Sequence, residues 1–497
     1  MPQPGYPRRP NERDPRAPRT AAPEPVRTGG VVAPAASGWL PDCVFTGEKF
    51  ESGLAFFADG LGRITRFSRE PADLAAARRL RGDAALPGLV NAHSQSVHRL
   101  LRGRTEHRAR AEGDSLGTWR AALESVAGRV SGQDIYDTAR MAFMEMLRSG
   151  ITCVGEFQTV HHQPDGQPWP EPNFLSHEVL RAARDVGVRL ALFKVAAVRG
   201  GAGSPGSAAL ARLQFSTTEQ FLRELEALRE FVARNHPGDD AWVGVAPLGL
   251  GAVPPAGLKL LADYAHAQRL RVQIPLPEGP AEHAAGVAEQ GRTPVALLAE
   301  LGLLDKRCTV VHAAHLTADD VRLLGAARAS VCACPTTERN RGSGGGPAEQ
   351  LLAAGVNLAL GTGSQTQIDL LEDARLLEYQ LRQQRQRRDG LAPDAASPLF
   401  HAATAAGARA LGAPSGALEV GRPADFFTVN LHDPSIAGAD PQTLLASLVF
   451  SLERRAIRDV WVGGRQVMAN GRHAYHGPIV GNFVELQRRL WSEPVAP

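Results

Sequence analysis

Short apolar runs alternate with longer amphipathic stretches through the middle of the chain. Eight apolar runs stand out, at residues 85–94, 151–158, 188–197, 241–248, 270–276, 308–313, 329–335 and 356–362. A short run that is apolar at nearly every position is typical of a strand buried on both faces. Stretches between the runs carry apolar residues at helical spacing, at 132–150, 175–188, 217–235, 255–268, 293–304, 317–328 and 347–355. Eight strands that alternate with helices predict an α/β fold, a (β/α)8 TIM barrel over residues 87–414.

The two flanks of this region have a different pattern. Residues 43–68 on one side, and 417–430 and 457–476 on the other, alternate short apolar runs with turn-forming residues. Asn470-Gly471, between two strand-like runs, indicates a β-hairpin. We expect residues 38–86 and 415–480 to build one small accessory β-sandwich together. The Pro- and Arg-rich residues 1–37 predict a disordered arm, and residues 481–497 a C-terminal tail or helix.

The composition is that of an ordinary soluble protein. Hydrophobic residues make up 43% and charged residues 22%, and a net charge of +3 gives no reason to expect a nucleic-acid partner. The five cysteines are scattered and odd in number, which argues against a secreted disulfide framework. We find no signal-peptide pattern and no membrane-spanning run, so we expect a cytoplasmic protein without a membrane partner. Lysine occurs at four positions only, a bias typical of GC-rich genomes such as those of actinobacteria.

Polar side chains follow the predicted strands where a barrel has its active site. The site of a (β/α)8 barrel lies at the carboxyl ends of its strands. The positions there include His93, Gln95, Glu156, Gln158, Gln273, Glu278, His312, His315 and Gln365. Carboxylates and imidazoles gathered at one barrel mouth can transfer protons. The pattern therefore predicts a site for a small-molecule substrate.

Several motifs resemble those of one enzyme family. The run PGLVNAHSQSVHRLLRG at 87–103 is similar to the first-strand motif of the amidohydrolase superfamily. The runs GEFQTVHHQPDGQPW at 155–169 and CPTTERN at 334–340 resemble formimidoylglutamate deiminase in particular. Similar segments occur at 114–120, 246–255, 310–317 and 370–388. Because the motifs occur in the expected order from about Trp39 onward, the resemblance covers nearly the whole chain.

The resemblance implies a metal site, from which this sequence departs. In the family one divalent ion, usually zinc, is held by the two His of an HxH motif, a His on strand five and an Asp on strand eight. Here His93 keeps the first histidine, whereas the other three positions carry Gln95, Pro275 and Gly363. One imidazole and one amide oxygen should not hold zinc tightly, because tetrahedral zinc needs three or four donors. We therefore expect neither a metal nor another cofactor.

Two other family positions are retained. Glu278 falls where the family has its acid/base glutamate, and His312 where it has the strand-six histidine that polarises or protonates the substrate. Together with His93 and His98 they form the set of candidate catalytic residues. The alternative is that Glu278 and His312 are inherited remnants without a role.

The substrate-binding positions of the family have mostly changed. Its Tyr, His and Arg fall at Thr159, Leu248 and Gly251, and a Gln falls at His98. Arg120 is retained and is a candidate for binding a carboxylate, although a surface salt bridge would explain it nearly as well. We expect a larger, more apolar pocket that no longer favours N-formimidoyl-glutamate. The candidate substrate-binding residues are Gln95, Arg120, Glu156, Thr159, Leu248, Gly363 and Gln365.

Two glycine-rich loops accompany the predicted barrel. Residues 198–215, after the third strand, form a long loop that could close over the mouth as a lid. The run from Arg341 to Gly345 lacks the Lys-Ser/Thr ending of a phosphate-binding loop. We expect a flexible loop there.

Three functional hypotheses remain open. The first is a metal-independent enzyme, suited to specialised metabolism, that acts on a C–N or C=N bond of a small molecule by hydrolysis, elimination or cyclisation. The second is a non-catalytic barrel that binds a ligand or a partner enzyme. The third is a deiminase or hydrolase whose metal is held by relocated ligands. We favour the first, and we expect a homodimer because family members are commonly dimers.

Overall fold

A computed structural model describes residues 37–106, 116–198, 211–388, 390–391 and 393–492. The disordered arm expected at 1–37 lies outside the described residues apart from Ser37. Most of the predicted lid loop at 198–215 lies outside them as well. None of the helices in the described ranges is both long and apolar enough to span a bilayer.

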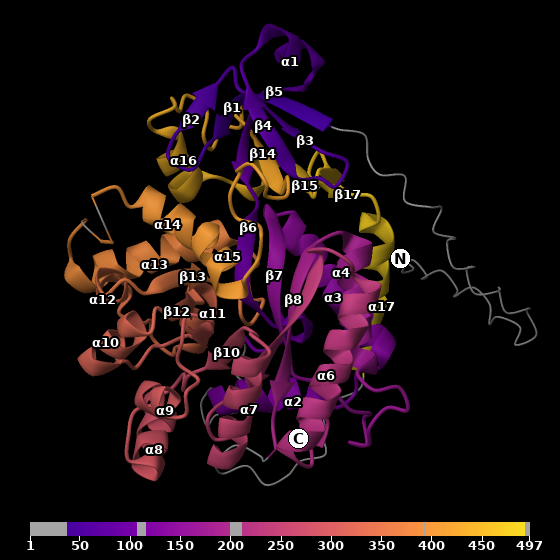
Figure 1. The fold of residues 1–497 in the computed structure, drawn as a ribbon, viewed down its shortest axis with the longest axis vertical. Coiled ribbons are helices and arrows are strands. Elements are labelled where there is room, and N and C mark those ends of the chain that lie inside the picture. The colour runs from indigo at the N-terminus through magenta and orange to yellow at the C-terminus, as the bar shows by residue number, and fades with distance from the viewer. Residues whose placement is uncertain (1–36, 107–115, 199–210, 389, 392, 493–497) are drawn as a thin grey trace, which may run out of the picture.

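Within the described residues, eight parallel strands form the barrel (Figure 1). They are β6 (Leu89–Ser94), β7 (Ile151–Gln158), β8 (Arg189–Ala196), β9 (Ala241–Pro247), β10 (Val272–Pro275), β11 (Cys308–Val311), β12 (Ser330–Ala333) and β13 (Asn357–Leu360). Neighbouring strands follow chain order. A parallel bridge between Ser94 and Gly363 joins the first strand to the segment after the last. The predicted (β/α)8 barrel is confirmed.

Helices surround the barrel and bury the outer faces of its strands (Figure 1). They are η1 (Ser96–Leu101), α2 (Leu116–Ala127), α3 (Gly132–Leu147), α4 (Phe174–Val186), α6 (Thr218–Asn235), α7 (Pro255–Ala267), α8 (Pro280–Gln290), α9 (Pro294–Glu300), α10 (Ala318–Ala326), α11 (Pro335–Arg341), α12 (Ala348–Ala353), α13 (Leu370–Arg385), α14 (Ala396–Ala403) and α15 (Ala405–Leu411). Every residue of β7 and β8 is buried, as a strand covered on both faces requires.

One short helix places two charged side chains at the barrel mouth. Pro335 opens α11 directly after β12, at a helix position where proline loses no hydrogen bond. Gly342 ends the helix with a φ of 66°. Glu338 and Arg341 are three residues apart and therefore share one helix face. We expected a flexible loop from Arg341 to Gly345. This expectation is wrong for Arg341, which is the last residue of α11.

The two ends of the chain build one accessory domain, which lies above the barrel in Figure 1. Its sheet contains β1 (Ser37–Phe45), β2 (Phe50–Ser52), β3 (Ala55–Ala58), β4 (Ile64–Ser68), β5 (Arg78–Pro87), β14 (Phe426–Asn430), β15 (Ile457–Val462), β16 (Arg465–Ala469) and β17 (Arg472–His473). The N- and C-terminal strands meet where β5 pairs with β14. They form a single connected sheet, where two packed sheets were expected.

Aromatic rings fill the core of this accessory domain. Trp39 lies 5.3 Å from Phe56 and 5.1 Å from Phe426 between ring centroids, and Phe426 stacks on Trp461 at 4.4 Å. These rings come from β1, β3, β14 and β15, so the sheet curls around its own core. The remaining helices are α1 (Pro71–Ala76), α16 (Leu444–Ser451), η2 (Arg454–Ala456) and α17 (His476–Ser492).

Candidate active site

His93, the next-to-last residue of β6, is a buried, neutral imidazole. Its Nδ1 lies 2.8 Å from Oε1 of Gln273, while the amide nitrogen of Gln273 donates to the carbonyl of Ala92 at 2.6 Å. This orientation of the amide assigns the ring proton of His93 to Nδ1. Burial lowers the pKa of His93 to about 3. Its Nε2 is thus an acceptor, to which the amide nitrogen of Gln95 donates at 3.3 Å.

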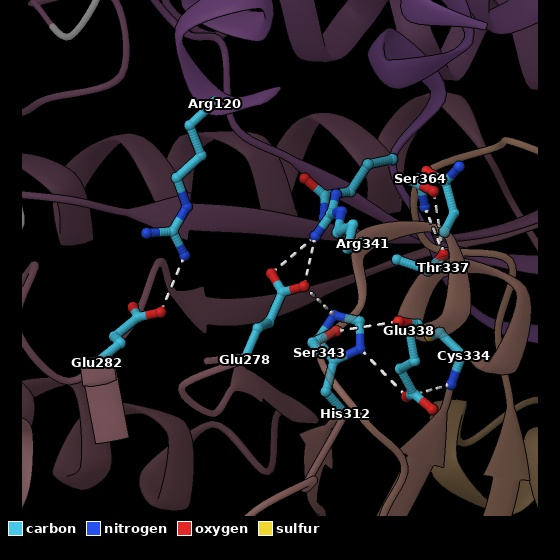
Figure 2. Close-up of polar contacts among 12 residues, drawn as sticks. Arg120, Glu278, Glu282, His312, Cys334, Thr337, Glu338, Arg341, Ser343 and Ser364 are labelled. Atoms are coloured by element: carbon cyan, nitrogen blue, oxygen red, sulfur yellow. Dashed lines mark hydrogen bonds and ion pairs between the residues drawn. The ribbon is translucent and has the colours of Figure 1, made fainter. Parts of the chain in front are cut away.

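His312 lies between two carboxylates directly after β11. Its Nε2 is 3.9 Å from Oε2 of Glu278, and its Nδ1 is 3.3 Å from Oε1 of Glu338 (Figure 2). The backbone N–H of Cys334 also donates to Glu338, at 2.8 Å. The sequence-predicted pair Glu278 and His312 is therefore brought together, whereas Glu338 was not predicted. Its signal was the CPTTERN motif, in which it is the acidic residue.

The backbone at His312 is strained. His312 has a φ of 69° and Ala313 a φ of 56°, in the left-handed region that non-glycine residues rarely adopt. Such a conformation costs about 1 to 2 kcal/mol per residue. Strained residues of this kind concentrate at functional sites, where surrounding packing holds them in place.

Arg341 binds the second carboxylate of the site. Its Nη1 lies 2.7 Å from both carboxylate oxygens of Glu278 (Figure 2). Its guanidinium lies 3.8 Å from the ring centroid of Trp119 on α2. Both residues lay in stretches singled out from the sequence, but neither was assigned to the site. Arg341, Glu278, His312 and Glu338 form one continuous chain of charged contacts.

The charges of this chain shift the pKa values of its members. Burial opposes the ionisation of Glu278, but His312 and Arg341 outweigh it and lower the pKa of Glu278 to about 2. Burial likewise opposes the protonation of His312, yet Glu278 and Glu338 raise its pKa above the usual value. The contacts of this chain therefore favour the ionised forms of both groups, a carboxylate at Glu278 and an imidazolium at His312.

His98 lies on η1 beside this chain. It is buried, and neither ring nitrogen has a hydrogen-bond partner among the residues that the structure describes. Its ring packs edge-on against Trp119 at 5.0 Å. Burial lowers the pKa of His98 well below its usual value, so the ring is neutral and offers one donor and one acceptor.

Glu156 and Gln365 bind other residues of the barrel. The hydroxyl of Ser94 donates to Glu156 at 2.5 Å, and the amide of Gln365 donates to that hydroxyl at 2.8 Å. Thr362 donates to the other end of the Gln365 amide at 2.9 Å. These contacts tie together the ends of β6, β7 and β13. The role of Glu156 and Gln365 in binding a substrate stays a prediction.

The other predicted substrate-binding residues lie around the mouth. Arg120 pairs with Glu282 at 3.1 Å, apart from the charged chain (Figure 2), and both side chains are more than 40% exposed, at 47% and 44%. This is the surface salt bridge that we gave as the alternative for Arg120. Thr159 is buried just past β7, and Leu248 packs on the apolar cluster inside the barrel.

The four positions that hold a metal in the resembling family do not fit one here. His93 offers one nitrogen and Gln95 an amide, while Pro275 and Gly363 have no side-chain donor. A Cβ on Gly363, whose φ is 48°, would lie 2.6 Å from Oγ1 of Thr337, so that hydroxyl takes the space of any larger side chain. Within the described ranges, no three His, Cys, Asp or Glu side chains gather as a metal site.

Comparison with known proteins points to the same family as the motifs. A sequence model of the amidohydrolase family matches residues 84–467. Formimidoylglutamate deiminase of Pseudomonas aeruginosa is 34% identical over 451 residues, which cover 88% of this chain and 98% of that protein. A 5-methylthioadenosine/S-adenosylhomocysteine deaminase of Moorella thermoacetica is 28% identical over 397 residues, or 78% of this chain and 82% of that protein.

Solved structures agree with this assignment. An amidohydrolase from Brucella melitensis superposes with a TM-score of 0.83 at 25% identity, covering 91% of this chain and 99% of that chain. An adenosine deaminase from Xanthomonas campestris with bound zinc shares the fold, with a TM-score of 0.78 at 23% identity over 92% of this chain and 99% of that chain. The resemblance drawn from the motifs is confirmed, and the chain belongs to the amidohydrolase family.

Proposed function

We propose that this chain is a metal-independent enzyme that acts on a C–N or C=N bond of a small molecule. The observation that carries the proposal is the buried ion pair of Glu278 and His312 at the carboxyl ends of the barrel strands. The similar proteins named deiminase and deaminase break C–N bonds, which supports the bond class. Hydrolysis, elimination and cyclisation at such a bond all need the proton transfers that this pair can supply.

The two residues would have unequal roles. The raised pKa of His312 favours its protonated form, which can give a proton to a nitrogen that leaves or to a C=N nitrogen under attack. Glu278, with a pKa of about 2, is a weak base and is better suited to orient His312 and to stabilise the imidazolium. His93 offers the neutral acceptor Nε2 across the mouth, 6.2 Å from His312 between ring centroids.

The burial of these four charged side chains favours a functional role over a purely structural one. Arg341, Glu278, His312 and Glu338 all have side chains that are 11% exposed or less. Ionisable groups are costly to bury, and apolar side chains of equal volume commonly stabilise a fold as well or better. Perturbed pKa values that coincide with backbone strain at a barrel mouth are typical of active sites.

The substrate should differ from N-formimidoyl-glutamate. Thr159, Leu248 and Gly251 stand where the resembling family has Tyr, His and Arg. A pocket without those groups loses its hydrogen bonds and its fixed cation for that substrate. We infer a substrate with more apolar surface.

A non-catalytic binding role is the second candidate. It is favoured by one observation, the contact of Arg341 with both oxygens of Glu278, which leaves that carboxylate less free to act on a ligand. Turnover separates the two candidates, because a binding scaffold predicts ligand-induced stabilisation without a product.

The test begins with the metal content of the purified protein, measured by elemental mass spectrometry before and after chelation. The chelated and zinc-supplemented forms are then assayed on amidines, N-formimidoyl amino acids, lactams and aminopurine nucleosides, with product detection by liquid chromatography and mass spectrometry. We expect equal turnover in both forms. Activity that appears only with zinc would overturn the metal-independent mechanism.

Variants then assign the chemistry to the pair. Glu278→Gln and His312→Asn should each lower kcat by about 100-fold or more. His177 and Glu171 form a matched surface pair at 2.8 Å, so His177→Asn and Glu171→Gln should leave kcat unchanged. Unchanged turnover in both site variants would exclude the pair as the source of the activity.

A further inference from the structure

Arg341 is the cation around which the charged groups of the mouth are arranged. Its side chain is only 4% exposed, and its charge acts on Glu278, His312, His93 and His98. The four residues at the metal-ligand positions of the family that the motifs resemble carry no positive charge in this protein. A guanidinium stays charged in a protein at any ordinary pH.

Contacts on two sides fix the position of this guanidinium. Glu278 accepts from Nη1 through both oxygens at 2.7 Å, and Trp119 lies against the guanidinium at 3.8 Å. Arg341 is the last residue of α11, where a positive charge also interacts favourably with the helix dipole. Gly342 ends the helix directly afterwards.

The Glu278 carboxylate is held in turn between Arg341 and His312. Its Oε2, which also accepts from Arg341, lies 3.9 Å from Nε2 of His312. The carbonyl of Glu278 accepts from Nε2 of His315 at 3.2 Å, which anchors the backbone of the same residue. Figure 2 shows the carboxylate between the guanidinium and the imidazole.

We propose that Arg341 is a positioning residue, a fixed guanidinium that keeps the Glu278 carboxylate ionised and aimed at His312. This inference rests on the proposed function, because it gives Glu278 its task toward His312. It assigns a role to a residue that lies just outside the CPTTERN motif at 334–340. Arg341 thereby supplies a positive charge at the barrel mouth. The positions that hold a metal in the family of the motifs do not offer a fitting set of donors there.

The charges that face Glu278 come from several elements. Arg341 on α11 and His312 after β11 are nearest, Arg120 on α2 contributes from farther away, and His93 on β6 faces the same group. Arg120 is exposed and already paired with Glu282. Removing Arg341 therefore leaves His312 as the one close cation of these four groups, and the carboxylate should become easier to protonate.

The test titrates the carboxyl group of Glu278 directly and needs no substrate. Protein labelled with ¹³C at glutamate Cδ is titrated by NMR, and Glu278→Gln identifies the signal. In Arg341→Met we expect the Glu278 titration to move up by about 1 to 3 pH units. Arg341→Gln, which keeps amide donors without the charge, should shift it in the same direction. Arg341→Lys should restore most of the wild-type value.

A buried glutamate elsewhere in the protein provides the control. Glu378 on α13 accepts from Arg382 at 2.8 Å, so Arg382→Met removes an arginine from a buried carboxylate away from the mouth. That variant should leave the Glu278 titration unchanged. An unshifted titration of Glu278 in folded Arg341→Met and Arg341→Gln would overturn the proposal.

Kinetics separates this proposal from the proposed function. With a substrate in hand, the acid limb of the kcat profile should move to higher pH in Arg341→Met by the same shift, and Arg341→Lys should reverse it. If the Glu278 titration shifts in Arg341→Met but the wild type shows no turnover, the proposed catalytic function is wrong and the positioning of Glu278 by Arg341 still holds. If turnover depends on Glu278 and His312 but the Glu278 titration does not shift in Arg341→Met, only the role of Arg341 is wrong.

Discussion

Glu156 is a buried carboxyl group whose protonation changes within the neutral range. Burial raises the pKa of Glu156 to about 7, although Ser94 and Ser96 donate hydrogen bonds that favour the charged form. The unfolded chain releases this proton near pH 4.3. Between these two values the folded state alone holds the proton, so the contribution of Glu156 to stability is present at low pH and is lost as pH rises toward 7.

Glu156→Gln should remove this part of the pH dependence. Between pH 5 and 8 the wild type should lose about 3 kcal/mol of unfolding free energy through Glu156, and the variant should not. Urea denaturation at several pH values gives the two curves, and their difference isolates Glu156 from other titrating groups. Curves that stay parallel over this range would contradict the prediction.

At the scale of elements, the C-terminal helix α17 supports the segment that carries His98. Its buried residues Ile479, Phe483, Leu486 and Leu490 lie on one helical face. The amide of Gln487 donates to the carbonyl of Leu100 on η1 at 3.1 Å. Arg99 of η1 lies 4.9 Å from the ring of Phe483. The helix thus links the chain end to the barrel mouth.

Phe483→Ala should destabilise the protein by about 3 to 5 kcal/mol, because it leaves a cavity under α17. Val484, the next residue, is 46% exposed, and Val484→Ala should change the unfolding free energy by no more than about 0.5 kcal/mol. Chemical denaturation of both variants measures the contrast. Equal effects of the two substitutions would show that α17 does not pack as described.

At the scale of the whole molecule, one buried ion pair joins the barrel to the accessory sheet. Arg189, which begins β8, binds Asp425 beside β14 at 2.7 Å, and both side chains are buried. Ser415 and the backbone N–H of Gly463 also donate to Asp425, each at 2.7 Å. The carboxylate is therefore fully surrounded by donors from both parts of the chain.

Asp425→Ala should cost about 3 to 5 kcal/mol, because it removes the buried carboxylate partner of Arg189 and leaves the exposed Asp240, at 2.9 Å, to balance that buried charge. The exposed pair of Arg422 and Glu419 offers the control, since Glu419→Ala should cost less than about 1 kcal/mol. Denaturation followed by far-UV circular dichroism and by tryptophan fluorescence measures both. An effect of Asp425→Ala as small as that of Glu419→Ala would contradict the role of this pair.

The fold was predictable where burial leaves a local pattern. The apolar run at 151–158 matches β7, because a strand covered on both faces must be apolar throughout. The run at 308–313 extends beyond β11, which ends at Val311, because His312 and Ala313 turn into left-handed backbone. The pattern of apolar residues does not predict such a turn, because contacts with residues distant in the sequence hold the turn in place.

The sequence by itself determined the barrel and the family, because these follow from local burial patterns and from residue identity. Only the tertiary structure decided which side chains meet. Arg341 reaches Glu278 across 63 positions of the chain, and Gln273 reaches His93 across 180. The start of α11 at Pro335 aims Arg341 into the mouth. Contacts of this kind depend on how complete elements pack, which no window of neighbouring residues encodes.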